Sequence, residues 1–210
     1  MNHATKEELI VFENCVKLAW EEGDLPFLLH LAGGNEDQLI HVFQSVLPGD
    51  WILGSHRSHY HWLLSGGSPM QLLEKIHAGE SMFLYSRALR FLTSSILAGN
   101  CCIAAGLALS IRQREGKEHV WCFLGDGAED EGHFYEAVSF VQGHDLPCTF
   151  VIEDNDRSVD TSIAARRGDL PRRDWGPHVV RYTYAPTYPH AGSGCRHHIT
   201  FKPRENPWKA

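Results

Sequence analysis

Several common signatures are missing from this 210-residue sequence. None of its six cysteines forms a C-x-x-C pair, and Cys122 and Cys148 stand inside apolar runs, where a thiol behaves as a small hydrophobic group. The pattern excludes a disulfide framework and is typical of a reduced, intracellular protein. No signal peptide is expected, because the N-terminus has no basic stretch followed by a long apolar one.

Long apolar runs are also missing, and the 19 lysines and arginines are outnumbered by 26 aspartates and glutamates. No stretch approaches the roughly 18 apolar residues that a membrane-spanning helix requires, so no membrane contact and a cytoplasmic location are expected. The formal net charge is -7, which disfavours binding along the phosphate backbone of a nucleic acid. With 43% hydrophobic and 21% charged residues, the composition is that of an ordinary globular domain.

Helical patterns are present from the start of the chain. Residues 1–24 predict one helix, because Thr5 and Glu8 have the spacing of a capping box and apolar residues then recur at helical spacing until Gly23. Further helices are expected over residues 36–46, 69–77, 99–113 and 129–143.

Short apolar runs predict buried strands. They cover residues 50–54, 120–124, 148–152 and 179–184, with a last short strand at 198–201. A strand, a helix and a strand of this size form a parallel crossover unit. The expected fold is α/β, a doubly wound and mainly parallel sheet with helices on both faces, in a single domain over residues 1–210.

The pattern weakens after Asp156. Residues 162–210 are therefore predicted to be an irregular C-terminal segment. The pairs Arg166-Arg167 and Arg172-Arg173 are interpreted as solvated loop charges.

Two oxygen donors each follow a predicted strand. Asp126 stands between Gly125 and Gly127, and Asn155 follows the next strand. Ligands of an open parallel sheet collect beyond the carboxyl ends of its strands. Hard oxygen ligands suit Mg²⁺, and the glycines and the following helix N-terminus allow a phosphate to approach closely.

Residues 125–161 (GDGAEDEGHFYEAVSFVQGHDLPCTFVIEDNDRSVDT) resemble the thiamine diphosphate motif, which begins with Gly-Asp-Gly and ends in Asn-Asn. The stretch is similar to the alpha subunits of the 2-oxo acid dehydrogenases that act on pyruvate, branched-chain acids or acetoin. Residues 131–137 (EGHFYEA) match the family's E-G-x-F-x-E-A helix. Upstream, residues 94–99 and 54–61 resemble the aminopyrimidine loop and the family's histidine-rich stretch.

The resemblance implies a role for each matching residue. Asp126 and Asn155 would be side-chain ligands of Mg²⁺, and Arg157 would offer its backbone carbonyl. Arg57 would pair with the diphosphate as a bidentate cation. The other implied cofactor-binding residues are Gly125, Gly127 and Ala128 at the diphosphate, Ser95 and Leu97 at the aminopyrimidine, and Glu153 and Val159. His56 and His59 are the catalytic candidates.

The resemblance also implies a partner chain. In the family, the glutamate that activates the cofactor belongs to a pyrimidine-binding domain, which lies on a separate beta chain in the two-subunit enzymes. The expected cofactors are thiamine diphosphate and Mg²⁺, the substrate is a small 2-oxo acid, and the assembly is α2β2. This chain departs from the family at residues 154–157, where Asp-Asn-Asp-Arg replaces Asn-Asn-Gly-Tyr.

Other interpretations remain open at this stage. Transketolase-like and acetoin-type enzymes share the diphosphate motif, and a non-catalytic metal-binding or interaction module would also retain it. Gly-Asp-Gly is a good turn sequence, and Ser95 could cap a helix. The histidines and cysteine that could instead bind zinc are His56, His59 and His61, and separately Cys195, His197 and His198. His197 and His198 are also candidates for the family's diphosphate-contacting histidine.

Overall fold

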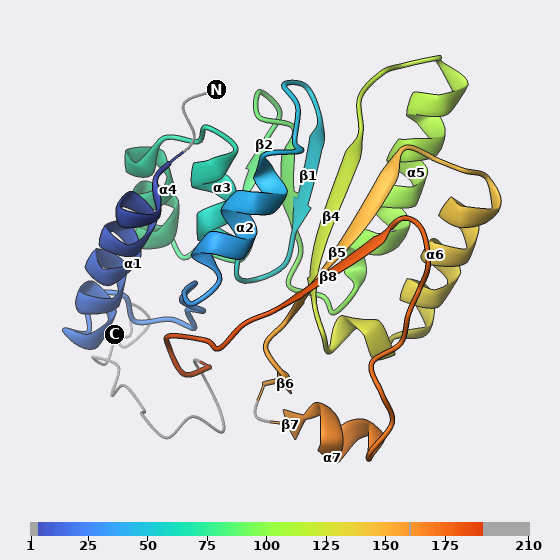
Figure 1. Ribbon diagram of the computed structural model, residues 1–210. Coiled ribbons are helices and arrows are strands. Elements are labelled where there is room, and N and C mark those ends of the chain that lie inside the picture. Colours follow the sequence, from blue (N-terminus) through green and yellow to red (C-terminus); the bar gives the residue numbers. More distant parts are fainter. Residues whose placement is uncertain (1–3, 160, 191–210) are drawn as a thin grey trace, which may run out of the picture.

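A six-stranded sheet forms the centre of the computed structural model, which describes residues 4–159 and 161–190 (Figure 1). The strand order is β2-β3-β1-β4-β5-β8, and only β2 is antiparallel to its neighbour. The strands are β1 (Trp51–Gly54), β2 (Tyr85–Ser86), β3 (Phe91–Thr93), β4 (Val120–Gly125), β5 (Cys148–Asp154) and β8 (Val179–Thr183). A separate hairpin pairs β6 (Arg157–Ser158) with β7 (Thr161–Ser162).

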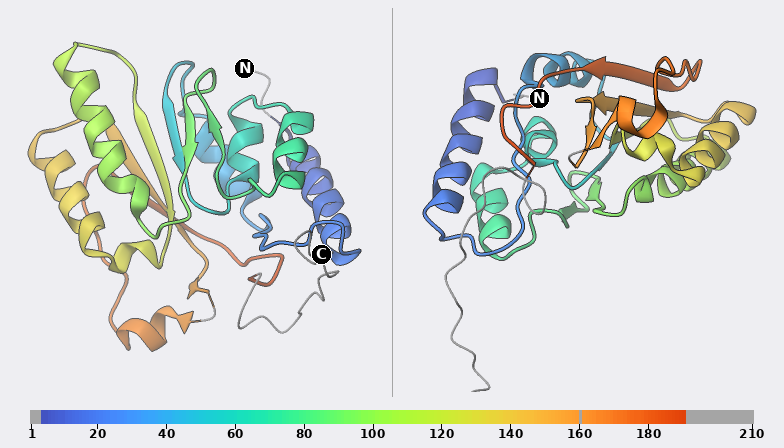
Figure 2. Two further views of the ribbon diagram at one scale, coloured as in Figure 1. Left: turned by 180° about the vertical axis from the view of Figure 1, so that it is seen from behind. Right: turned by 90° about the horizontal axis from the view of Figure 1, so that it is seen from below.

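Helices cover both faces of this sheet (Figure 2). On one side lie α1 (Lys6–Glu21), α2 (Glu36–Phe43), α3 (His59–Leu64) and α4 (Pro69–His77), and on the other lie α5 (Gly99–Gln113) and α6 (Gly132–Gly143). A 3-10 helix, η1 (Ala128–Asp130), and the short α7 (Ile163–Arg167) lie beyond the strand ends. The expected α/β class with a mainly parallel sheet is confirmed.

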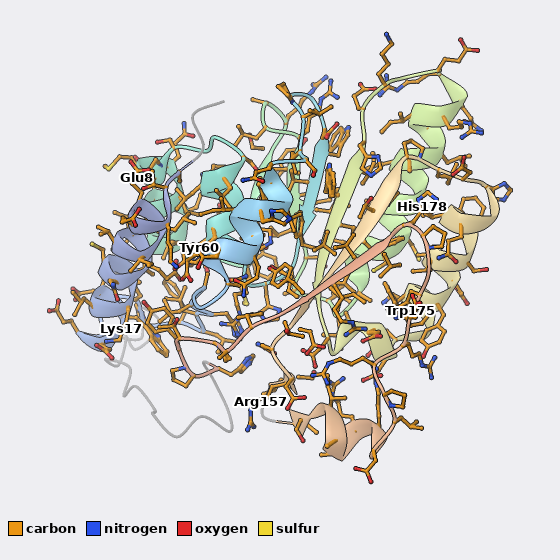
Figure 3. All side chains as sticks on the ribbon, viewed as in Figure 1. Glu8, Lys17, Tyr60, Arg157, Trp175 and His178 are labelled. Atoms are coloured by element: carbon orange, nitrogen blue, oxygen red, sulfur yellow. The ribbon has the colours of Figure 1, made fainter. Side chains whose placement is uncertain are left out.

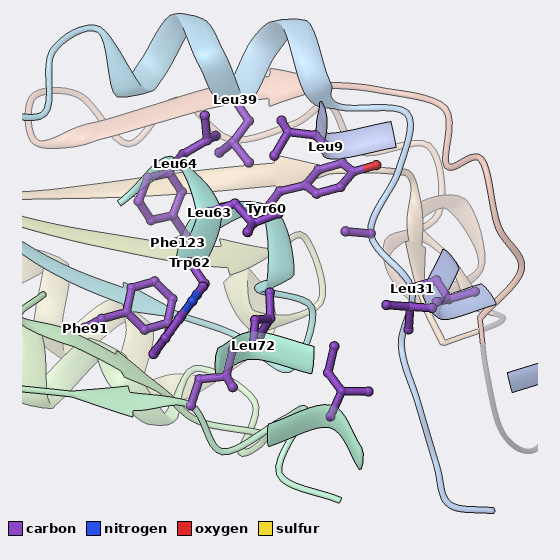
Figure 4. Packing of buried hydrophobic residues seen from close by; sticks show 14 of the residues in the cluster. Leu9, Leu31, Leu39, Tyr60, Trp62, Leu63, Leu64, Leu72, Phe91 and Phe123 are labelled. Carbon is purple, nitrogen blue, oxygen red and sulfur yellow. The ribbon is translucent and has the colours of Figure 1, made fainter. Parts of the chain in front are cut away.

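Side chains that alternate between the two faces of the central strands contribute to two separate hydrophobic cores. Phe123 and Val151 face the α1–α4 side, whereas Cys122 and Phe150 face α5 and α6, because successive strand residues point to opposite faces. Figure 4 shows Phe123 in the first core with aromatic and leucine side chains from α2 and α3. Both faces of β4 and β5 are therefore buried, as their unbroken apolar sequences predicted.

Most predicted elements appear near the expected bounds, with three corrections, whereas α3, β2 and β3 were not predicted. The capping box is present, with the Thr5 side chain and Glu8 bonded to each other's backbone. The helix expected to reach residue 46 ends at Phe43. The helix expected over residues 129–143 is divided, because Glu131 has an extended backbone (φ -82°, ψ 135°) between η1 and α6. Strand β5 runs on to Asp154 because its last two carboxylates find partners.

The C-terminal segment is more ordered than predicted. Within the expected irregular segment, α7 is a regular helix that was not predicted, whereas β8 confirms the strand expected at 179–184 and completes the sheet beside β5. Cys195, His197, His198 and the strand expected at 198–201 lie outside the described residues. Within the described ranges, no helix has both the length and the apolar composition needed to cross a bilayer.

A close backbone crossing joins the end of the described chain to its beginning. The Thr187 amide donates to the Gly33 carbonyl at 3.1 Å. Gly34 has φ +92°, and a Cβ there would collide with the Ala185 carbonyl oxygen. Only glycine satisfies both demands without strain. This crossing brings residues 185–190 over the carboxyl ends of the strands.

Candidate functional site

A cavity of about 770 Å³ opens at the carboxyl ends of β1, β4 and β5. This is where an open parallel sheet places its ligands. The residues predicted for the site that line it are His56, Arg57, Leu97, Gly125, Asp126, Gly127, Ala128, Glu153, Asn155, Arg157 and Val159. Ser95 and His59 do not line it, whereas Ser94, the neighbour of Ser95, does.

Asp126 is a buried carboxylate, and only one of its two oxygens has a hydrogen-bond partner. Its Oδ2 atom pairs with Arg166, whereas Oδ1 is buried and has no hydrogen-bond partner. Burial raises the Asp126 pKa to about 6; the charge of Asp154 adds to the rise and that of Arg166 opposes it. A buried oxygen without a partner is costly, so Asp126 suits a cation that would bind Oδ1.

Asn155 and Arg157 lie across the same cavity from the Gly-Asp-Gly turn. The register of β4 and β5 pairs Gly125 with Glu153, so the residues that follow each strand come together. Asn155 Oδ1 accepts from the Arg157 amide at 3.1 Å, and its Nδ2 donates to the Tyr184 hydroxyl at 3.4 Å. Figure 3 shows Arg157 on the hairpin side of the strand ends. Asp126 and Asn155 therefore face one common space.

The turn itself has room for an anion. A Cβ added at Gly125 would meet nothing within 4 Å, so this backbone borders open space. A Cβ at Gly127 would collide with Ser158, which fixes the hairpin against the turn. Together with the unpartnered Asp126 oxygen, this geometry fits a metal–diphosphate pair.

Arg57 supplies positive charge on the opposite side of the cavity. Its Nη1 donates to the Leu31 carbonyl, and its Nη2 lies 3.4 Å from His190 Nδ1. Three imidazoles surround it: the ring centroids of His30 and His56 are 4.4 Å apart, and those of His30 and His190 are 4.5 Å apart. This group of four side chains is called the His–Arg cluster below.

Two of the three imidazoles in the His–Arg cluster are held in the neutral form. Burial, followed by neighbouring positive groups, lowers the His30 pKa to about 2 and the His56 pKa to about 3. Ring nitrogens of the three histidines lie within 4.8 Å of one another, a spacing that could hold a transition metal. The fixed charge of Arg57 opposes a cation there, so the cluster suits an anion better.

The histidine-rich stretch does not form the zinc site considered from the sequence. His59 is fully buried and bonds Glu13 at 3.0 Å and Ser81 at 2.8 Å. His61 packs on Phe123 with its Nε2 3.3 Å from Glu153. His56 alone reaches the cavity, because residues 58–64 turn into α3 and send the later side chains into the core. His59 is therefore a structural residue and not a catalytic candidate.

Three of the four arginines that were expected to be solvated instead neutralise the acids of the turns. The pairs join Arg166 to Asp126 and Asp130, Arg167 to Glu129 and Asp130, and Arg172 to Asp154 and Asp156. Arg181 of β8, for which no such expectation was made, pairs with Glu129 and Asp154. Arg173 lies over the Tyr135 and Trp175 rings. The paired residues lie far apart in the sequence and follow no periodic pattern, so the sequence alone did not indicate these ion pairs.

Sequence reasoning also missed His30 and His190. His30 stands in an apolar stretch without a motif of its own, and His190 follows the weak C-terminal pattern. The glycine pair at 33–34 was the available signal, because it marks a close backbone approach.

Comparison with known proteins agrees with this geometry. Residues 7–169 match the family model described as dehydrogenase E1 component. The alpha subunits of acetoin:2,6-dichlorophenolindophenol oxidoreductase from Cupriavidus necator and Bacillus subtilis are 28% and 30% identical, over 81% and 70% of this chain. The pyruvate dehydrogenase E1 component subunit alpha of Rickettsia conorii is 29% identical over 72% of this chain.

The chain spans about half the length of these relatives, with 51%, 47% and 49% of each covered. A solved structure described as that of a thiamin diphosphate-dependent enzyme from Mycobacterium smegmatis aligns with 55% of this chain and 19% of its own, at a TM-score of 0.37 and 17% identity. The family match covers most of the sequence and includes the cavity turns, and it confirms the expected family: the chain belongs to the dehydrogenase E1 component family.

Proposed function

We propose that this chain binds the diphosphate of thiamine diphosphate through Mg²⁺ and acts as the alpha-like half of a 2-oxo acid or acetoin dehydrogenase. The observation that carries the proposal is the unpartnered, buried Asp126 oxygen on the same cavity as Asn155. The names of the relatives, acetoin oxidoreductase and pyruvate dehydrogenase subunits, support the reaction class.

Each side of the cavity would contribute in its own way. Asp126, Asn155 and the Arg157 carbonyl would hold the cation. The amides that follow Gly125 would donate to the diphosphate, and Arg57 would pair with its charge. When bound, the cofactor supplies a carbanion that adds to a carbonyl and stores electrons.

A beta-like, pyrimidine-binding partner is part of the proposal, in an α2β2 assembly. Among the described residues that line the cavity, the carboxylates are those of Asp126 and Glu153. Glu153 is already bonded by Tyr182 and Asn35, so neither is placed to activate an aminopyrimidine ring. The exposed apolar side chains of Ile96, Leu97 and Val159 border the cavity and would be covered by such a partner.

Calorimetry of the full chain with thiamine diphosphate and Mg²⁺ tests the proposal. Asp126→Asn keeps the shape of the side chain but removes its charge, and we expect at least a tenfold loss of affinity. Asp37→Asn is the matched control, because Asp37 forms only a surface ion pair with Lys6. Equal affinity of Asp126→Asn and the wild type would contradict the cation site. No binding even with a beta-like chain present would favour a non-catalytic module.

A further inference from the structure

Arg166 lies on the carboxylate that is proposed to hold the metal. Its Nη2 atom pairs with Asp126 Oδ2, its Nη1 atom lies 3.4 Å from the Asp126 carbonyl oxygen, and it also pairs with Asp130. The Arg166 side chain is 14% exposed and that of Asp126 is 1% exposed. Solvent therefore screens this pair weakly, and the protein itself already neutralises much of the Asp126 charge.

We propose that Arg166 makes metal binding depend on the diphosphate. This inference rests on the proposed function, since it takes Asp126 as a metal ligand. A divalent cation on Oδ1 would stand beside the fixed positive charge on Oδ2, in a partly buried setting where such repulsion is strong. The negative charge of a diphosphate would attract both the metal ion and Arg166 and would offset the repulsion between them. The cavity thus rejects the free ion and accepts it together with a diphosphate.

The neighbouring charges keep Arg166 in place when no ligand is bound. The turns at the ends of β4 and β5 carry five carboxylates, which form ion pairs with four arginines. The carboxylates are Asp126, Glu129, Asp130, Asp154 and Asp156, and the arginines are Arg166, Arg167, Arg172 and Arg181. Arg167 holds α7 independently through Glu129 and Asp130. A change at Arg166 should therefore alter the charge at Asp126 while α7 keeps its position.

A purely orienting role for Arg166 would have the opposite sign. Carboxylates that bind metals are often held by an outer hydrogen bond, and losing it weakens metal binding. If Arg166 only orients Asp126, its removal lowers the affinity for the free cation. If Arg166 opposes the cation, its removal raises that affinity. The direction of the change separates the two roles.

The experiment measures free Mn²⁺ by electron paramagnetic resonance with the full chain, without and with inorganic pyrophosphate. We expect Arg166→Gln to bind Mn²⁺ alone at least tenfold more tightly than the wild type, and the difference to shrink when pyrophosphate is present. Arg166→Lys keeps the charge and should stay near the wild type. Arg167→Gln is the matched control, because Arg167 does not contact Asp126.

Two further measurements complete the test. The double variant Asp126→Asn/Arg166→Gln should lose the gain, which locates it at Asp126. Unchanged or weaker Mn²⁺ binding by Arg166→Gln, or a gain that survives in the double variant, overturns the inference. If pyrophosphate promotes Mn²⁺ binding in the wild type but thiamine diphosphate does not bind, the proposed function fails and the role of Arg166 stands.

Discussion

His30 is a titratable group that folding keeps neutral. It is 5% exposed, and burial lowers its pKa to about 2, against an ordinary value near 6.5. The ring contributes no charge to the His–Arg cluster at neutral pH. Arg57 therefore supplies the fixed charge that meets an anion on this side of the cavity.

This neutrality predicts a pH-dependent stability. Below pH 6.5 the unfolded chain takes up a proton at His30 that the folded chain refuses, so stability falls as the pH falls. From pH 7 to pH 5 the loss from His30 alone should be about 2 kcal/mol. Urea unfolding at both pH values measures it. His30→Gln should reduce the slope without removing it, because the lowered pKa of His56 contributes in the same direction. An unchanged slope in that variant would rule out His30 as a source.

At the scale of residues, the sequence predicted which side chains reach the cavity where they belong to a motif. It failed where the tertiary fold determines the direction of a side chain. Asp126, Asn155 and Arg57 all reach the cavity as expected. His59 does not, because its position in the first turn of α3 directs the ring to Glu13 in the core. A run of histidines in a sequence does not show which of them the following helix will bury.

At the scale of elements, the crossing at Gly34 determines where the last described residues lie. Strand β8 leads into residues 185–190, which pass over Gly33 and Gly34 and place His190 beside His30. Because this contact is between backbones, a side chain at residue 34 cannot be accommodated by a rotamer change.

Gly34→Ala should therefore damage both stability and the cavity. The positive φ alone costs roughly 1–3 kcal/mol for a residue with a side chain, and the collision with Ala185 adds to it. Gly66→Ala is the control, since Gly66 has φ +82° but an added Cβ there meets nothing within 4 Å. Urea unfolding and pyrophosphate affinity of both variants decide the matter. Equal behaviour of the two variants would show that the crossing is unimportant.

Regular elements were predictable because their signals are local. The apolar runs of β4 and β5 and the small-residue helix α5 appear at or near the expected bounds. Helix α7 and the Arg–Asp pairs were missed because Arg166 and Asp126 are forty residues apart and carry no periodicity. Charged residues at the end of β5 were likewise excluded from the strand, although Arg181 and Tyr182 on β8 compensate them.

At the scale of the whole molecule, exposed apolar side chains border the cavity. Ile96 is 71% exposed and Val159 is 49% exposed, and both border the cavity. Apolar side chains gathered at a ligand site are typical of a surface that another chain covers. This arrangement agrees with a half-site that a partner completes.

Ile96→Asp should prevent assembly with a beta-like chain while leaving the fold intact, because a charge would have to be buried in the interface. Leu18→Asp is the control, since Leu18 is also exposed but lies on α1, away from the cavity (Figure 1). Co-expression followed by size-exclusion chromatography measures the complex. Assembly of Ile96→Asp at wild-type yield would place the partner on another surface.

The crossing at Gly34 also affects when the ligand site can form during translation. The ribosome releases the N-terminal part first, so His30 and Arg57 emerge long before His190, and the turn acids emerge before Arg181. Until Thr187 has left the exit tunnel, the nascent chain has no segment that can cross over Gly33. The ligand site is therefore one of the last parts of the described chain to form in the cell.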